Sequence, residues 1–132
     1  MTLAPLLSAS AVIQVHAFAA LAALGLGIVQ LSAPKGTLPH RTIGWAWVAL
    51  MLVVCVSAFF IHKITLWGAF GPIHLLAIFT LVAVPMAVLH ARRHAVARHR
   101  VAMTSIFFGA LVIAGAFTLW PGRIMHAVVF GP

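Results

Sequence analysis

Four apolar runs, each about 20 residues long, constrain the fold of this sequence more than any other feature. They cover approximately residues 11–31, 43–61, 72–91 and 101–121. A helix of ~20 residues rises ~30 Å, which is the thickness of the hydrocarbon core of a bilayer. No alternating barrel pattern is present, so helices are the way to satisfy the backbone in lipid. We therefore predict an all-α integral membrane protein, a four-transmembrane-helix bundle formed by one domain over residues 1–132.

The composition supports a membrane protein. Hydrophobic residues make up 64% of the chain and charged residues 6%, whereas an ordinary soluble domain is ~25% charged. The eight Lys and Arg have no Asp or Glu in the sequence to pair with. Their counter-ions must be lipid phosphates, helix C-termini, a bound anion or an acidic partner. We expect anionic phospholipids and either an acidic protein partner or a second copy of the chain, and no nucleic acid, because the charges lie in short turns.

The positive charges also predict an orientation. The turns between helices one and two and between helices three and four hold most of them, namely Lys35, Arg41, Arg92, Arg93, Arg98 and Arg100. The opposite side holds only Lys63 and Arg123. The positive-inside rule predicts that both basic turns are cytoplasmic and that both termini lie on the outer side.

The two halves of the chain repeat one pattern, in which a helix leads to a His-Arg turn and a second helix returns. The interval from His16 to His40 nearly equals that from His74 to His99. Both halves run in the same direction, so we predict two parallel helical-hairpin repeats related by a pseudo-two-fold axis along the membrane normal. Such an axis brings His16 opposite His74 near the outside and His40 opposite His99 near the inside.

Paired imidazoles at two depths favour haem b over other groups. Ionisable residues inside a membrane are costly and by default functional. Zinc would want further ligands, commonly Cys or carboxylate, which this chain does not offer there. Haem b needs two axial ligands, a narrow apolar slot and cations for its propionates. The predicted ligands of one or two haems are the pairs His16 with His74 and His40 with His99.

Other residues are predicted to pair with the haem propionates or to serve as alternative ligands. Arg41 and Arg100 are the predicted partners of the propionates. His90 is the substitute ligand at the inner level, and Met86 or Met103 would allow His/Met ligation with a higher potential. A copper site of His and Met is also conceivable, but no tight cluster argues for it.

The remaining histidines, His62, His94 and His126, are interpreted as interfacial. His90 and His94 are four residues apart and would share a helical face if helix three continued into the turn. Interfacial histidine requires no bound ligand, so these three are predicted to pack or to be solvated.

Small side chains mark two helices for close packing. The first helix carries a stripe of Ala20, Ala23 and Gly27, and the fourth presents Gly109 and Gly115 among others. Small residues let membrane helices approach one another closely. We predict that both stripes lie at helix contacts.

Over essentially its whole length the sequence resembles a bacterial family of small four-helix predicted membrane proteins of unknown function. The most specific part of the resemblance is a Lys-Gly-Thr, His-Arg, Gly order at Lys35, Gly36, Thr37, His40, Arg41 and Gly44. The resemblance implies four helices in a bacterial inner membrane and brings no established activity. The arrangement also resembles four-helix di-haem b-type cytochromes, which pass electrons across bacterial membranes and often exchange them with quinone. That second likeness is architectural, since no diagnostic cytochrome motif matches.

These observations predict a transmembrane b-type cytochrome or haem-bearing subunit, a membrane oxidoreductase or electron-transfer protein of the bacterial inner membrane. A quinone could dock near Trp45, Trp47 or Trp67. The alternative is a non-catalytic accessory or assembly subunit of a larger membrane complex, whose acidic partner supplies the missing carboxylates. Proton pumping is the least favoured hypothesis, because the chain has no acidic side chain to relay protons.

Overall fold

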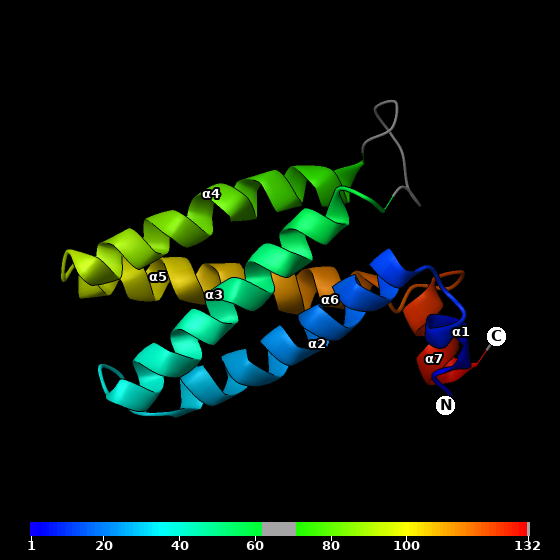
Figure 1. Cartoon of the computed structure of the whole chain (residues 1–132), viewed down its shortest axis with the longest axis horizontal. Helices are drawn as coiled ribbons and strands as arrows, with labels where there is room; N and C mark the ends of the chain where they lie inside the picture. The colour runs from blue at the N-terminus through cyan, green and yellow to red at the C-terminus, as the bar shows by residue number, and fades with distance from the viewer. Residues whose placement is uncertain (62–70, 132) are drawn as a thin grey trace.

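The computed structural model describes residues 1–61 and 71–131, and it contains four helices long and apolar enough to cross a membrane. They are α2 (Ala11–Ser32), α3 (Leu38–Ala58), α4 (Pro72–Arg92) and a fourth helix over Val96–Phe117. Neither described range contains a strand. Both chain ends lie at one end of the bundle, here called the terminal end, and the turns at 33–37 and 93–95 lie at the other, the turn end (Figure 1). The predicted all-helical membrane fold is confirmed.

The helices form a closed ring of neighbours. Helix α2 packs against α3, α3 against α4, and α4 against α5 (Val96–Ile106). The ring closes through η1 (Phe107–Ile113), which packs against α2. Consequently α2 and α4 are diagonal to each other and run in the same direction, as are α3 and the fourth helix (Figure 1).

The fourth membrane helix is not a regular α-helix. Its middle part, η1, is a π-helix, and α6 (Ala114–Phe117) then completes the span. π-Helical turns are rare and widen the helix locally. Ile106, Phe107 and Leu111 are all buried around this segment, so it provides the wall of the core that faces α2.

Two short helices close the terminal end. Helix α1 (Ala4–Leu7) packs against α7 (Ile124–Phe130), and the Thr2 amide donates to the Val128 carbonyl over 3.0 Å. Leu6 is completely buried in this contact region. The two ends of the chain are therefore held together across the same end of the bundle (Figure 1).

Two helices begin five residues before the apolar runs at 43–61 and 101–121. Helix α3 begins at Leu38 because Thr37 caps it: the Thr37 hydroxyl accepts a hydrogen bond from the His40 amide over 3.3 Å, and Pro39 follows at a position that needs no donor. The fourth helix begins at Val96, and its first turn is polar. Polar first turns extend both helices beyond the hydrophobic pattern.

Lys35 closes the C-terminal end of α2. Its ammonium donates hydrogen bonds to the carbonyl oxygens of Gln30, Leu31 and Ala33, at 2.5, 3.0 and 2.6 Å. The last carbonyls of a helix have no partner within the helix and carry partial negative charge, so a cation stabilises them. Gly36 follows with φ of +76°, a conformation that glycine adopts at no steric cost. The helix C-terminus is thus the counter-charge of Lys35.

The core lies between α2, α3, α4 and the π-helical segment. Its buried members are Ala23, Trp47, Met51, Val84, Ala87, Ile106, Phe107 and Leu111. The tightest contact is at Gly27, where an added Cβ would lie only 2.4 Å from Cε2 of Phe107 and 3.3 Å from Nε1 of Trp47. The predicted close approach along Ala23 and Gly27 is confirmed.

The predicted close packing at Gly109 and Gly115 of the fourth helix is wrong. A Cβ built on Gly109 or on Gly115 would meet no atom within 4 Å. The π-helix explains the error, because it changes the angular positions that an ideal α-helix gives these residues. The close packing of the fourth helix is made instead by the Phe107 ring on Gly27.

We expect Gly27→Ala to lower stability, because the new methyl group overlaps the Phe107 ring. Overpacking of a core typically costs ~1–3 kcal/mol. Gly25→Ala is the matched control, since a Cβ there meets nothing within 4 Å, and it should be neutral or stabilising. Thermal unfolding in detergent compares the two. Equal melting temperatures for both variants would contradict the packing described here, and Phe107→Leu should relieve the defect of Gly27→Ala.

Candidate functional site

At the terminal end, His16 of α2 is bound to the last turns of α3. Its Nδ1 lies 3.0 Å from the Val54 carbonyl oxygen and 3.0 Å from Oγ of Ser57. A carbonyl oxygen only accepts, so Nδ1 carries the proton and the neutral ring has its lone pair on Nε2. A histidine that ligates a metal commonly donates its other N–H to a carbonyl in this way.

His74 of α4 lies at the same level and is buried, with 1% of its surface exposed. Its ring centroid is 6.0 Å from that of Phe59, the residue that directly follows α3. The Gly71 amide donates to Nδ1 of His74 over 2.9 Å, so the neutral ring carries its proton on Nε2. His74 thereby replaces the capping side chain that Gly71 lacks at the start of α4. His16 and His74 both contact residues at the end of α3, Val54 and Ser57 for His16 and the capping Phe59 for His74, and their tautomers are opposite.

At the turn end, the His40 peptide is fixed between two helices. Nε2 of Gln30 in α2 donates to the His40 carbonyl over 2.8 Å. Gly44 permits this approach, because a Cβ there would lie 3.3 Å from Nε2 of Gln30. Gly44 is the last residue of the Lys35–Gly44 signature. The carboxamide of Gln30 therefore ties the start of α3 to α2.

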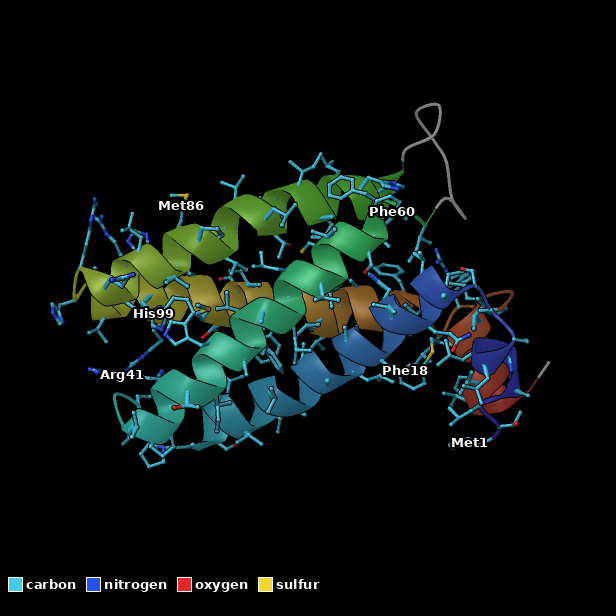
Figure 2. The ribbon with its side chains drawn as sticks, viewed as in Figure 1. Met1, Phe18, Arg41, Phe60, Met86 and His99 are labelled. Atoms are coloured by element: carbon cyan, nitrogen blue, oxygen red, sulfur yellow. The ribbon has the colours of Figure 1, made fainter. Side chains whose placement is uncertain are left out.

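His99, on α5, faces the same region. Its Nδ1 lies 2.8 Å from the carbonyl oxygen of Ala87 in α4, so Nδ1 is the donor and the lone pair of the neutral ring is on Nε2. Arg41 lies at the same end of the bundle as His99, as Figure 2 shows, and its side chain is exposed. The turn end thus holds one histidine from each of two diagonal helices, His40 on α3 and His99 on α5.

Three buried polar atoms in the described ranges have no hydrogen-bond partner, all at the turn-end half of α2 and α3. They are Oε1 of Gln30, Nδ1 of His40 and Nε1 of Trp47. Buried polar groups are usually paired, so a cluster of exceptions calls for an explanation. Sequence reasoning did not single out Gln30. A carboxamide at the inner end of an otherwise apolar helix was the signal that could have found it.

Helix α4 does not continue into the turn, so the condition for a shared helical face of His90 and His94 is not met. Helix α4 ends at Arg92, and His94 has a φ of +58°. The His94 amide donates to the Ala91 carbonyl, and the Ala95 amide donates to the His90 carbonyl. These two bonds form a Schellman motif, in which the left-handed position usually holds glycine. His94 therefore ends the helix.

The remaining histidine and methionine candidates lie at separate places in the bundle. His126 Nδ1 donates to the Leu119 carbonyl over 2.7 Å beside the Phe130 ring. Met86 points away from the bundle and is 53% exposed (Figure 2). Met103 packs against the core. His62, Lys63 and Trp67 lie outside the described residues.

A family model described as "Predicted membrane protein (DUF2306)" matches residues 13–130. The chain belongs to the DUF2306 family. No curated protein and no solved structure matches it. The family match spans all four membrane helices of this DUF2306 protein, together with each of the four predicted haem ligands, and its description names a membrane protein without an activity.

One histidine at each end of this DUF2306 chain has its Nδ1 on a carbonyl oxygen and its Nε2 lone pair available, namely His99 at the turn end and His16 at the terminal end. His99 offers an Nε2 lone pair with its Nδ1–H already donated, and Nδ1 of His40 is buried without a partner. At the terminal end only His16 is so arranged, because His74 uses Nδ1 as an acceptor. In the described part of the chain no three His, Cys, Asp or Glu side chains cluster as for a metal ion held by protein alone. Two axial ligands are the only protein donors that a haem requires.

Substitution of His94 tests whether its backbone conformation or its imidazole is the important feature at this position. We expect His94→Gly to raise the free energy of unfolding by about 0.5–1 kcal/mol, because glycine adopts the left-handed conformation without strain. His94→Val should lower it by about 1–2 kcal/mol. Chemical unfolding in detergent measures both. If the Gly and Val variants lost the same stability, the imidazole rather than the backbone would be the important feature.

Proposed function

We propose that this protein is a haem-bearing electron-transfer protein of the bacterial inner membrane, with His40 and His99 as its principal haem ligands. The observation that supports the proposal is the place of these two histidines at the turn end, on diagonal helices, one with a buried Nδ1 that lacks a partner and the other with Nδ1 bound to a carbonyl. A bis-imidazole site of this kind uses one histidine from each of two facing helices.

The residues around the pair have distinct roles in this proposal. The Ala87 carbonyl orients His99 and increases the basicity of its ring. Gln30 fixes the backbone of His40. Arg41 and Arg100, which are exposed at the turn end, would pair with the propionates. Haem b, when bound, supplies a one-electron iron couple, while the protein sets orientation and excludes water.

A second haem at His16 and His74 requires one change in the chain. His74 must release the Gly71 amide so that its proton can move to Nδ1 and its Nε2 can bind iron. His16 needs no such change. The proposal therefore assigns the stronger site to the turn end and the weaker site to the terminal end.

Location and orientation follow from charge. The turn end carries six of the eight Lys and Arg, while Arg123 lies toward the terminal end. The positive-inside rule then assigns the turn end to the cytoplasm. An electron path between the two levels would cross the inner membrane, and quinone is the electron carrier dissolved in that membrane that we propose as the exchange partner.

A non-catalytic accessory subunit is the second candidate, and a specific observation favours it. Within the signature, Lys35 caps α2, Gly36 makes the turn, Thr37 caps α3, and Gly44 admits Gln30. These are structural roles that need no cofactor. An acidic partner would then neutralise the exposed arginines, since the chain has no Asp or Glu.

Absorption spectra of the full chain purified in mild detergent distinguish the two candidates. We expect a Soret band and, after reduction, an α band. His99→Ala and His40→Ala should each reduce the haem occupancy of the turn-end site at least tenfold, whereas His126→Ala, at the other end of the bundle, should retain it. His99→Met keeps an iron ligand and should raise the reduction potential. Folded, colourless wild-type protein that takes up no added haem would overturn the proposal and favour the accessory subunit.

A further inference from the structure

A groove between α3 and α4 is separate from both histidine levels. Its volume is about 350 Å³, and it is lined by Trp45, Val48 and Leu52 of α3 and by Pro85, Val88 and Arg92 of α4, among others. This is near the lower limit of ligand pockets, which span ~300–1,000 Å³. None of the histidines that the structure describes lines it.

The groove results from how α3 and α4 cross. Near the terminal end their contact is made by the small residues Cys55, Ala58 and Ala77, which let the helices approach closely. Toward the turn end the two helices diverge (Figure 1). Larger side chains flank the resulting gap without filling it, and Trp45 at its edge is 57% exposed.

The chemistry of the lining is apolar with one charge. Arg92, in the last turn of α4, is the only charged residue that lines the groove. Its guanidinium has no carboxylate side chain anywhere in the chain to pair with. Trp45 belongs to the residue type that anchors at the membrane interface. An apolar channel that leads to a guanidinium at the interface matches an acyl chain that ends in a phosphate.

We propose that this groove is a binding site for one anionic phospholipid, with an acyl chain between α3 and α4 and the phosphate on Arg92. A guanidinium binds phosphate through parallel N–H···O bonds. A neutral quinone would leave Arg92 without a counter-charge. The inference does not depend on the proposed haem.

Native mass spectrometry of the full chain in detergent tests this site with phosphatidylglycerol and phosphatidylcholine of the same acyl length. We expect one phosphatidylglycerol to be retained per chain, and phosphatidylcholine much less. Arg92→Gln should lower phosphatidylglycerol retention at least about fivefold, consistent with the loss of one cation at the lipid surface. Arg93→Gln removes the same charge one residue away, outside the groove, and should have little effect.

A second pair of variants tests the apolar part of the site. Leu52→Trp fills the groove and should reduce phosphatidylglycerol retention while Arg92 remains, whereas Leu75→Trp, on an exposed surface of α4 outside the groove, should not. Circular dichroism confirms that each variant is folded. Equal losses for Arg92→Gln and Arg93→Gln, equal retention of the two lipids by wild type, or no effect of Leu52→Trp would each overturn the proposal.

Discussion

The structure depends on one constraint: in hydrocarbon, the chain must satisfy its own polar groups, and it has no carboxylate to help. Helices pair the backbone N–H and C=O groups within the bilayer. The backbone groups that still need hydrogen-bond partners are therefore those at the helix ends. Lys35 donates to three carbonyls at the end of α2. A Schellman turn at His94 closes α4, and Thr37 opens α3. Because the chain's own residues cap these helix ends, the two helices of each hairpin are held in one register relative to each other.

That register determines which side chains meet. The helices form a ring, so α3 is diagonal to the fourth helix, and the short turns keep His40 and His99 at the same level. The Phe107 ring against Gly27 then holds the fourth helix on α2. Polar atoms left without partners, on Gln30, His40 and Trp47, lie in this half of the bundle. Packing and capping therefore determine which side chains lie at the turn end.

The sequence predicts much of this fold, because membrane helices are signalled by apolar length alone. The four spans and the common direction of the two hairpins follow from local pattern. Three features do not. The π-helix leaves no local signal in FFGALVI, so Gly109 and Gly115 were misassigned. The left-handed His94 follows from helix termination, which a spacing of four residues cannot reveal. The tautomers of His16, His74 and His99 depend on tertiary neighbours, and these separate the stronger candidate ligand pair from the weaker one.

The central claim is that the helix ring brings His40 and His99 into apposition at the turn end. Its most direct test is cross-linking of His40→Cys with His99→Cys, in a Cys55→Ser background, by a short thiol-reactive reagent. The account predicts an efficient intramolecular cross-link for this pair. It predicts none for His40→Cys with His126→Cys, because those positions lie at opposite ends of a bundle that spans ~30 Å of hydrocarbon. Failure of the first pair, or equal cross-linking of both, would contradict the account.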